Sequence, residues 1–460
     1  MREELYNGIN IQKPWPPRMK EKEQALKKNI DRIPETICYL SNPPKVIPIH
    51  VGRQLFVDDF LIDTSTLQRK YYYPEPYVGN PILKPQTKIE KNEGCCPVAA
   101  TFTDGVFYDS KDGLYKMWYQ AGWFDGTAYA ESLDGQNWYR PDLDVVPGTN
   151  MVLPFRKGYK RDGATVWIDH ETKDPKSRYK LFVFFRKNEV EEIGELYISS
   201  DGIHWNGPTI TGPCGDASSF FYNPFRKKWV FSIRKVDVEG DFHYRYRQYY
   251  ETEDFLKGAD WGRNDPVFWY GADDLDKKHA IYDCTTQLYG VDCVAYESIL
   301  LGAFEIFKGP HNRIAEELGV PKQCDITLGY SRDGFHFCRP DRTAFLKGSE
   351  KKGTWDYGYI HASGGLCIVE KDQLRFYYSA WSGESPKYGK HMYAGGATGY
   401  ATLRRDGFAS VAAEKEGFLK TRVLVFKGEY LWLNTISDLG EVRVEAVSYT
   451  HQTLPTTSRV

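Results

Sequence analysis

Three short stretches decide the fold: SLDGQNW (residues 132–138), SSDGIHW (residues 199–205) and SRDGFHF (residues 331–337). Each stretch follows a strand-like run that contains tyrosine, and its Asp-Gly pair is a signal for a tight turn. Degenerate copies follow the same kind of run at YYETEDF, around Asp254, and at GYATLRRDGF, around Asp406. The five aspartates are 67, 53, 79 and 73 residues apart, which indicates five repeats of about 68 residues.

A second pattern lies upstream of each turn, where two runs of β-branched or aromatic residues are joined by a polar turn. The clear copies are FYDSKDGLYKMWY, WIDHETKDPKSRYKLFVF, FYNPFRKKWVFSI and CIVEKDQLRFYYS, and a looser copy is YESILLGAFEIF. Each repeat therefore supplies about four strands, and such a unit needs neighbours to cover its faces. We predict an all-β fold, with a five-bladed β-propeller as the catalytic domain over residues 47–416.

The remaining segments differ from the repeats. Residues 1–46 form an N-terminal extension, in which an amphipathic helix is predicted within residues 18–32. Residues 417–447 contain further strands separated by Gly-containing turns, and we predict that they form a partial C-terminal β-sandwich. Residues 448–460 are polar and without periodicity, and we expect a non-native tail there.

Composition excludes several classes of protein. With 41% hydrophobic and 27% charged residues the chain can bury a core, and a net charge of -2 provides no general attraction for nucleic acid or anionic lipid. No apolar run reaches the roughly 18 to 20 residues of a membrane helix, and the charged, proline-containing N-terminus is unlike a signal peptide. Nine cysteines without CxxC pairs fit a reducing compartment. We expect a cytoplasmic protein that binds neither nucleic acid nor a membrane; its oligomeric state is not indicated.

The candidate chemical groups are carboxylates near the start of the first strand of each repeat, because the innermost strands of a propeller converge on one channel. Asp162 and Asp216 occupy the same slot, 39 and 38 residues before the next turn aspartate, and Asp292 lies 41 residues before its own. Two residues compete in the first repeat. Asp104 lies on the matching face of its strand, whereas Glu93 fits the 41-residue offset.

Further polar and aromatic residues complete the predicted site. Glu297 lies in an otherwise apolar strand, where an unpaired charge is costly. His361 holds the matching place in the fifth repeat, and Arg161 directly precedes Asp162. The side chains predicted to contact a sugar from loops and strands at the channel mouth are Trp118, Trp123, Arg234, Tyr359 and Trp381.

Carboxylates gathered around a narrow channel suit cleavage of a glycosidic bond, which needs one protonated acid and one ionised base or nucleophile. Mutual repulsion separates the pKa values of such groups. The chain lacks HExxH, GxSxG, GxxxxGK[ST] and a strand-linked GxGxxG, so the common metalloprotease, hydrolase and nucleotide-binding motifs are not present. No cofactor or metal is predicted, although a calcium ion in the channel would leave no sequence signature.

Several of these motifs resemble the superfamily of glycoside hydrolase families 32 and 43. They are NPIL (residues 80–83), RDG (residues 161–163), the SxDGxxW turns and GFLKTRVLVFKGEYLWLN followed by GEVRVEAV. QLFVDDFLI, CGDASSFFYNPFRKKWVFSIR and VAYES resemble more closely a group of family-32-like propeller proteins. The resemblance implies a five-bladed propeller, followed in family 32 by a β-sandwich.

The resemblance also implies roles for three residues. By position, Asp104 resembles the family's nucleophile or base, Asp162 its orienting carboxylate and Asp216 its general acid. The chain departs from family 32 in lacking the WMNDPNG start, in having RDG for RDP, and in carrying aspartate where the acid is glutamate. These departures leave Glu297 as a second candidate acid.

The sequence thus predicts a glycoside hydrolase that acts on a furanoside or a related sugar at a non-reducing end. Asp104, Asp162, Asp216 and Glu297 are the catalytic candidates, and the substrate-binding candidates are Glu93, Arg161, Trp123, Arg234, Asp292, Tyr359 and His361. Two alternatives stay open. A non-catalytic carbohydrate-binding propeller would use the same aromatic groups without turnover. A glycoside phosphorylase would need a basic phosphate pocket, for which Arg161, Arg234 and His361 are the visible candidates.

Overall fold

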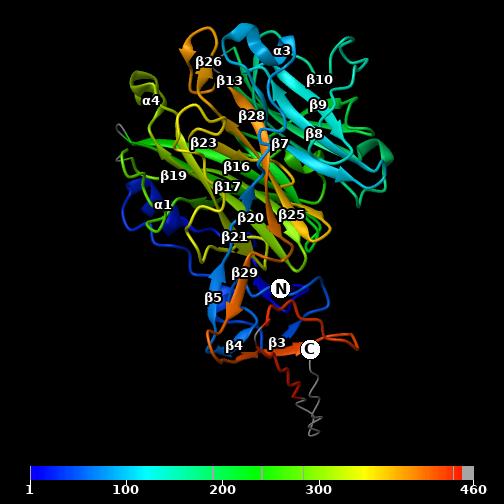
Figure 1. Ribbon diagram of the computed structural model, residues 1–460, viewed down its shortest axis with the longest axis vertical. Coiled ribbons are helices and arrows are strands. Elements are labelled where there is room, and N and C mark those ends of the chain that lie inside the picture. The colour runs from blue at the N-terminus through cyan, green and yellow to red at the C-terminus, as the bar shows by residue number, and fades with distance from the viewer. Residues whose placement is uncertain (1, 189–190, 240–241, 283, 439, 448–460) are drawn as a thin grey trace.

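In the computed structural model the chain forms successive antiparallel sheets with few helices (Figure 1). The structure describes residues 2–188, 191–239, 242–282, 284–438 and 440–447. The first three large sheets have four strands each, which follow one another in sequence order. They are β7 (Ala99–Asp109), β8 (Leu114–Ala121), β9 (Gly126–Ser132) and β10 (Met151–Leu153); β11 (Tyr159–Ile168), β12 (Tyr179–Lys187), β13 (Glu191–Ser199) and β14 (Asn206–Ile210); and β15 (Ser219–Asn223), β16 (Lys228–Glu239), β17 (Phe242–Thr252) and β18 (Val267–Gly271).

The fourth large sheet has nine strands. They are β19 (Gln287–Tyr296), β20 (Ile299–Gly309), β21 (Gln323–Ser331), β22 (Phe337–Cys338), β23 (Tyr359–Ala362), β24 (Ile368–Glu370), β25 (Gln373–Trp381), β28 (Gly396–Arg404) and β6 (Glu75–Pro76). A single parallel pair, Cys324 with Tyr359, joins its two antiparallel halves. β6 pairs with β28, so a strand from before the first sheet completes the last one. The all-β class is confirmed, and the division of this sheet into a fourth and a fifth blade stays a prediction.

The Asp-Gly turns share one hydrogen-bond pattern. In the first turn Ser132 Oγ accepts from Gly135 N at 2.9 Å, and Asp134 Oδ1 accepts from two backbone N–H groups at 2.8 Å. The second and third turns repeat these contacts. The glycine φ values of 70°, 81° and 87° lie in the left-handed region, where glycine has no side-chain penalty.

An aromatic side chain from a neighbouring sheet fixes each of these turns. Trp118 Nε1 donates to the carbonyl of Gly202 at 2.7 Å, and Trp269 Nε1 donates to the carbonyl of Phe335 at 2.8 Å. Tyr377 in turn donates to the carbonyl of Gly135 at 2.8 Å, which joins the last repeat to the first. Trp118 is fully buried, so its predicted contact with sugar is replaced by a structural role between two sheets.

The first strands of the repeats lie beside one another. β7 neighbours both β11 and β23, β11 neighbours β15, and β15 neighbours β19. A bridge between Phe102 and Ser363 also joins β7 to the residue that follows β23. Side chains on these strands therefore meet at the centre, which is where the candidate carboxylates were expected.

The two ends of the described chain form small sheets together, which Figure 1 shows at one end of the molecule around β3, β4, β5 and β29. β31 (Val423–Val425) pairs with β3 (Val46–Pro48), β30 (Leu419–Thr421) with β4 (Ile62–Ser65), and β29 (Ala409–Ala412) with β5 (Gln68–Tyr71). Residues 426–438 and 440–447 contain no strand. The partial β-sandwich over residues 417–447 stays a prediction, and the tail at 448–460 lies outside the described residues.

The remaining elements are short. They are β1 (Arg2–Glu4), β2 (Asn10–Gln12), α1 (Lys20–Lys28), α2 (Cys38–Ser41), α3 (Lys88–Lys91), α4 (Asn312–Leu318), β26 (Glu384–Ser385) and β27 (Gly389–Lys390). Helix α1 lies within the predicted range, and its Leu26 is buried against β17 and β18. Across the described ranges, no helix has the length and apolar character needed to cross a bilayer.

Candidate active site

Two of the predicted carboxylates share one guanidinium group. Asp162 lies on β11, Asp216 lies in the loop before β15, and Arg186 stands near the end of β12. Arg186 donates from Nε to Asp162 Oδ2 at 2.9 Å and from Nη2 to Asp216 Oδ2 at 2.5 Å. Asp216 forms a second ion pair with Arg234 on β16. The planar guanidinium fixes the direction of its N–H groups, so the two carboxylates are held beside each other.

The same two carboxylates retain contact with solvent. The side chains of Asp162 and Asp216 are 8% and 13% exposed, whereas the side chain of Asp104 has no exposure. Ion pairs with guanidinium groups stabilise a carboxylate in its charged form. Their ion pairs and their partial exposure place Asp162 and Asp216 for the roles of base, nucleophile or orienting group in glycosidic cleavage.

Asp104 is buried in the first sheet beside Arg161. It lies where the register of β7 and β8 shifts, between Ala100 and Gly105. Burial raises the pKa of Asp104 to about 6, although the Arg161 guanidinium opposes the rise. Arg161 is itself fully buried, and its Nε donates to Thr127 Oγ1 at 3.3 Å. Arg161 therefore positions Asp104 and is not available to bind a sugar hydroxyl.

Asp292 is the carboxyl group best suited to carry a proton near neutral pH. It lies in the middle of β19 and is 6% exposed. Burial and the nearby Glu305 carboxylate raise the pKa of Asp292 to about 7, and its Oδ2 has no hydrogen-bond partner among the described residues. An uncharged carboxyl group in this position can donate a proton.

Glu305 also orients His361. Glu305 Oε2 lies 2.8 Å from His361 Nδ1, and its Oε1 accepts from the backbone N–H of Ala362 at 2.8 Å. Both side chains are fully buried, and within the described chain His361 Nε2 has no hydrogen-bond partner. His361 thus lies in the same buried group as Asp292, packed against the rings of Phe102, Tyr289, Tyr359 and Trp381.

Arg247 connects Asp292 with the pair that Arg186 holds. It lies on β17 with no exposed surface, and its Nη1 donates at 2.7 Å to the carbonyl of Ala217, the residue after Asp216. Burial lowers the pKa of Arg247 to about 10, and the charges of Asp292 and Glu305 act against this shift. One guanidinium therefore spans from the Asp216 loop to the surroundings of Asp292.

The structure separates Glu297 and Glu93 from this group. Glu297 was predicted in a strand, but it lies in the turn after β19 and pairs with Arg53 at 2.7 Å. Five residues of strand place it about 16 Å from Asp292, so it cannot serve the same bond. Glu93 is exposed in a short 3-10 helix (Asn92–Gly94), and no hydrogen bond or ion pair within the described ranges links it to Asp104.

The aromatic candidates have different surroundings. Trp123, in the turn between β8 and β9, is half-buried and stacks on Tyr393 with ring centroids 4.3 Å apart and an interplanar angle of 12°. Tyr359 is 1% exposed and donates to the hydroxyl of Tyr289 at 3.2 Å, and Trp381 is fully buried. Of the four predicted aromatic contacts, Trp118, Tyr359 and Trp381 are buried, and Trp123 is the one that a sugar ring can reach.

The second strands of the repeats supply residues that the sequence search missed. The predicted carboxylates were placed near the first strand of each repeat. Four further polar residues lie six or seven residues after the start of a second strand: Gln120, Arg186, Arg234 and Glu305. Among these, Arg234 alone was a candidate. The sequence does contain a signal for these four residues. Each of them is the polar residue that ends a mainly apolar run: YKMWYQ, LFVFFR, WVFSIR and LLGAFE.

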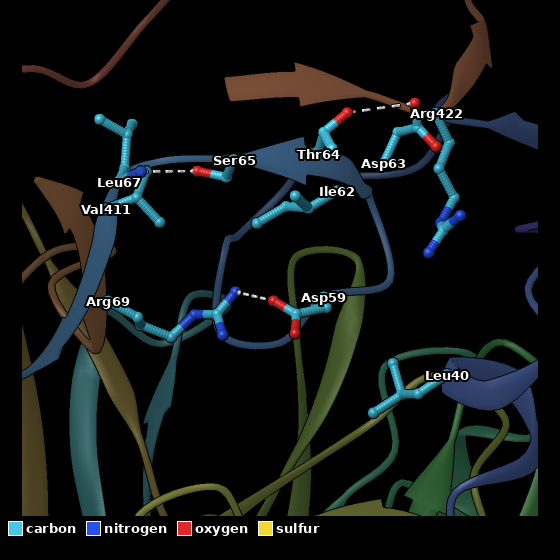
Figure 2. Close-up of a pocket in the computed structure, with 10 residues that line it drawn as sticks. All are labelled: Leu40, Asp59, Ile62, Asp63, Thr64, Ser65, Leu67, Arg69, Val411 and Arg422. Atoms are coloured by element: carbon cyan, nitrogen blue, oxygen red, sulfur yellow. Dashed lines mark hydrogen bonds and ion pairs between the residues drawn. The ribbon is translucent and has the colours of Figure 1, made fainter. Parts of the chain in front are cut away.

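A pocket of about 600 Å³ lies elsewhere, beside β4 and the C-terminal segment (Figure 2). It is lined by Leu40, Asp59, Ile62, Asp63, Thr64, Ser65, Leu67, Arg69, Val411 and Arg422. Figure 2 shows Asp59 and Arg69 facing each other, with Arg69 Nη2 donating to Asp59 Oδ1 at 2.6 Å. No predicted site residue lines this pocket, so it is separate from the carboxylate group.

Comparisons with known proteins give structural similarity at low identity. No protein-family model and no curated protein matches the chain. The chain is similar to a thermostable family-43 glycoside hydrolase, with 14% identity, coverage of 71% of this chain and 96% of the other, and a TM-score of 0.48. An N-acetylgalactosamine deacetylase from F. plautii is 15% identical, with coverage of 70% of this chain and 96% of the other and a TM-score of 0.45. An endo-arabinase from Bacteroides thetaiotaomicron is 12% identical, with coverage of 66% of this chain and 96% of the other and a TM-score of 0.41. At TM-scores below 0.5 these similarities assign no residue of the site.

Proposed function

We propose that the protein is a glycoside hydrolase whose reacting groups are Asp162, Asp216 and Asp292. One observation carries the proposal: the Arg186 guanidinium holds two carboxylates beside each other, and Arg247 links the Asp216 loop with the surroundings of Asp292, whose pKa is raised to about 7. Cleavage of a glycosidic bond requires this difference between an ionised and a protonated carboxyl group.

The contacts assign a role to each group. Asp216 is the most exposed of the carboxylates and acts as the base or nucleophile, while Asp162 orients the substrate from the other side of Arg186. Asp292 donates its proton to the leaving oxygen. Asp104, the base expected from the sequence, is buried against Arg161 on β11, the strand that also carries Asp162. The half-buried Trp123 and Tyr393 stack offers a flat surface for a sugar ring.

The finer assignments rest on the sequence. The motifs shared with families 32 and 43 support a five-bladed propeller and a furanoside or related sugar at a non-reducing end. The cysteine pattern supports a cytoplasmic location.

The test is a panel of aryl furanosides and pyranosides with the wild type and three variants, Asp162→Asn, Asp216→Asn and Asp292→Asn. We expect each substitution to lower kcat/KM by about 100-fold or more, because each removes a proton-transfer or charge role. Glu93→Gln and Glu297→Gln are matched controls that neutralise carboxylates outside the group, and we expect them to keep wild-type rates. Release that survives all three substitutions would contradict the assignment. Glycan binding without release from any substrate would favour a binding module.

A further inference from the structure

Three arginines crowd one face of the third sheet. Arg234 on β16 and Arg247 on β17 are directly opposite each other in the antiparallel ladder, and Arg245 lies two residues along β17 on the same face. Like charges directly opposite in a sheet are destabilising. Arg234 is ion-paired with Asp216, whereas Arg245 donates at 2.6 Å to the neutral Gln287 Oε1. The sheet therefore holds more positive charge on this face than its own partners balance.

A buried lysine adds to this charge. Lys322, directly before β21, is 2% exposed, and its Nζ donates to Tyr393 OH at 2.5 Å. The same Nζ lies 4.3, 5.2 and 5.9 Å from the ring centroids of Tyr393, Tyr359 and Tyr289. The ion pairs of the described residues give Lys322 no carboxylate partner. Aromatic rings are only a partial partner for an amino group of this kind, so Lys322 Nζ can still donate to an anion.

These cations act on one another and on the proposed reacting groups. Burial, with Arg245 and Arg247 nearby, lowers the pKa of Arg234 to about 10. Burial together with Arg245 also lowers the pKa of Lys322 well below its usual range, and the Asp162 carboxylate opposes this shift. The cations therefore border the Asp162 side of the carboxylate pair.

The balance of charges and hydrogen bonds is incomplete. Asp162 and Asp216 share Arg186, and Asp216 also pairs with Arg234, whereas the ion pairs of the described residues give Arg245 no carboxylate. The Nε groups of Arg234 and Arg245 are buried and have no acceptor among the described residues. Buried N–H groups are normally paired, and a guanidinium selects carboxylate and phosphate oxygens.

We propose that Arg234, Arg245 and Lys322 form a subsite for an anionic oxygen group beside the reacting carboxylates, a sugar carboxylate or a phosphate. The proposal deepens the proposed function, because it rests on that site and identifies an acidic sugar, or phosphate beside a neutral sugar, as the ligand. The half-buried Trp123 and Tyr393 stack places the sugar ring next to Lys322.

Binding tests the subsite without turnover. Calorimetry at constant ionic strength would use glucuronate and inorganic phosphate as probes, with wild type, Lys322→Met and Arg245→Met. We expect at least one probe to bind the wild type with a Kd in the millimolar range or below, and each variant to weaken it at least tenfold. Arg53→Met removes an exposed cation elsewhere and is expected to bind as the wild type does. No binding of either probe, or equal loss in the control, would overturn the subsite. Thermal unfolding shows whether each variant is folded. If Arg245→Met does not fold, Arg245→Gln is used in its place.

Turnover then distinguishes the source of the anion. An aryl glucuronide and the matching aryl glucoside would be compared with and without phosphate. A preference for the glucuronide that falls at least tenfold in Lys322→Met supports a sugar carboxylate. Phosphate-dependent release, in which the glycosidic C–O bond breaks, a sugar phosphate forms and the leaving oxygen takes a proton, supports phosphate. Cleavage with neither effect overturns the subsite and leaves the hydrolase standing. Anion binding that depends on Lys322, without cleavage of any substrate, supports the subsite and overturns the proposed hydrolase.

Discussion

Replacing Asp292 by asparagine is expected to stabilise the fold at alkaline pH while it removes activity. Asparagine has nearly the shape of the protonated carboxyl group but cannot ionise. Burial and Glu305 raise the pKa of Asp292 from 3.8 to about 7 in the folded chain. The folded state therefore binds the proton more tightly than the unfolded state, and the wild type loses stability as pH rises from about 4 to about 7.

The size of the effect follows from this shift. One pKa unit corresponds to about 1.36 kcal/mol, so the raised pKa of Asp292 lowers the stability of the wild type by about 2 kcal/mol at pH 5 and by about 4 kcal/mol at pH 8. The stability advantage of Asp292→Asn should thus grow by about 2 to 3 kcal/mol between these two values. Urea unfolding followed by tryptophan fluorescence at each pH measures the difference.

A matched control separates this effect from general changes with pH. Glu93→Gln alters an exposed carboxylate, and we expect its difference from the wild type to stay within about 0.5 kcal/mol at both pH values. An Asp292→Asn variant that is less stable than the wild type at pH 8, or whose advantage does not change with pH, would refute the reasoning.

Three further outcomes are expected. The kcat/KM of the wild type should fall above about pH 7 as Asp292 loses its proton, and Glu305→Gln should move that limb to lower pH because it removes a like charge; pH-rate profiles measure both. Arg332→Met should cost about 3 to 5 kcal/mol in urea unfolding, since it leaves the buried Asp58 carboxylate without its 2.8 Å ion pair. Trp118→Phe should cost about 1 to 3 kcal/mol and leave KM unchanged, because the lost hydrogen bond joins two sheets; a raised KM would restore Trp118 as a sugar contact.

The local chemistry of the chain could be predicted well from the sequence. The Asp-Gly turns at Asp134, Asp201 and Asp333 depend on contacts within four residues, so the sequence contains all of their partners. The short helix within residues 18–32 follows from local periodicity in the same way. Equal offsets in neighbouring repeats predict that Asp162 and Asp216 lie close together, and both contact Arg186.

The placement of Glu297 shows where this reasoning fails. Its surroundings suggested a strand, yet one residue decides whether a side chain near a hairpin lies in the ladder or in the turn. In the structure Glu297 pairs with Arg53, which is 244 residues away in sequence. A contact at such a distance has no signature in a local pattern.

The sequence by itself determined the all-β class, the Asp-Gly turns and the equal offsets of Asp162 and Asp216 in their repeats, because these depend on periodicity and on short-range hydrogen bonds. Only the tertiary structure decided the burial and the neighbouring charge that raise the pKa of Asp292. Arg186 reaches Asp216 across 30 residues, and Glu305 lies near Asp292 only because β19 and β20 pair. Charge and burial act through space, and the distances that set them arise when the sheets pack around a common centre.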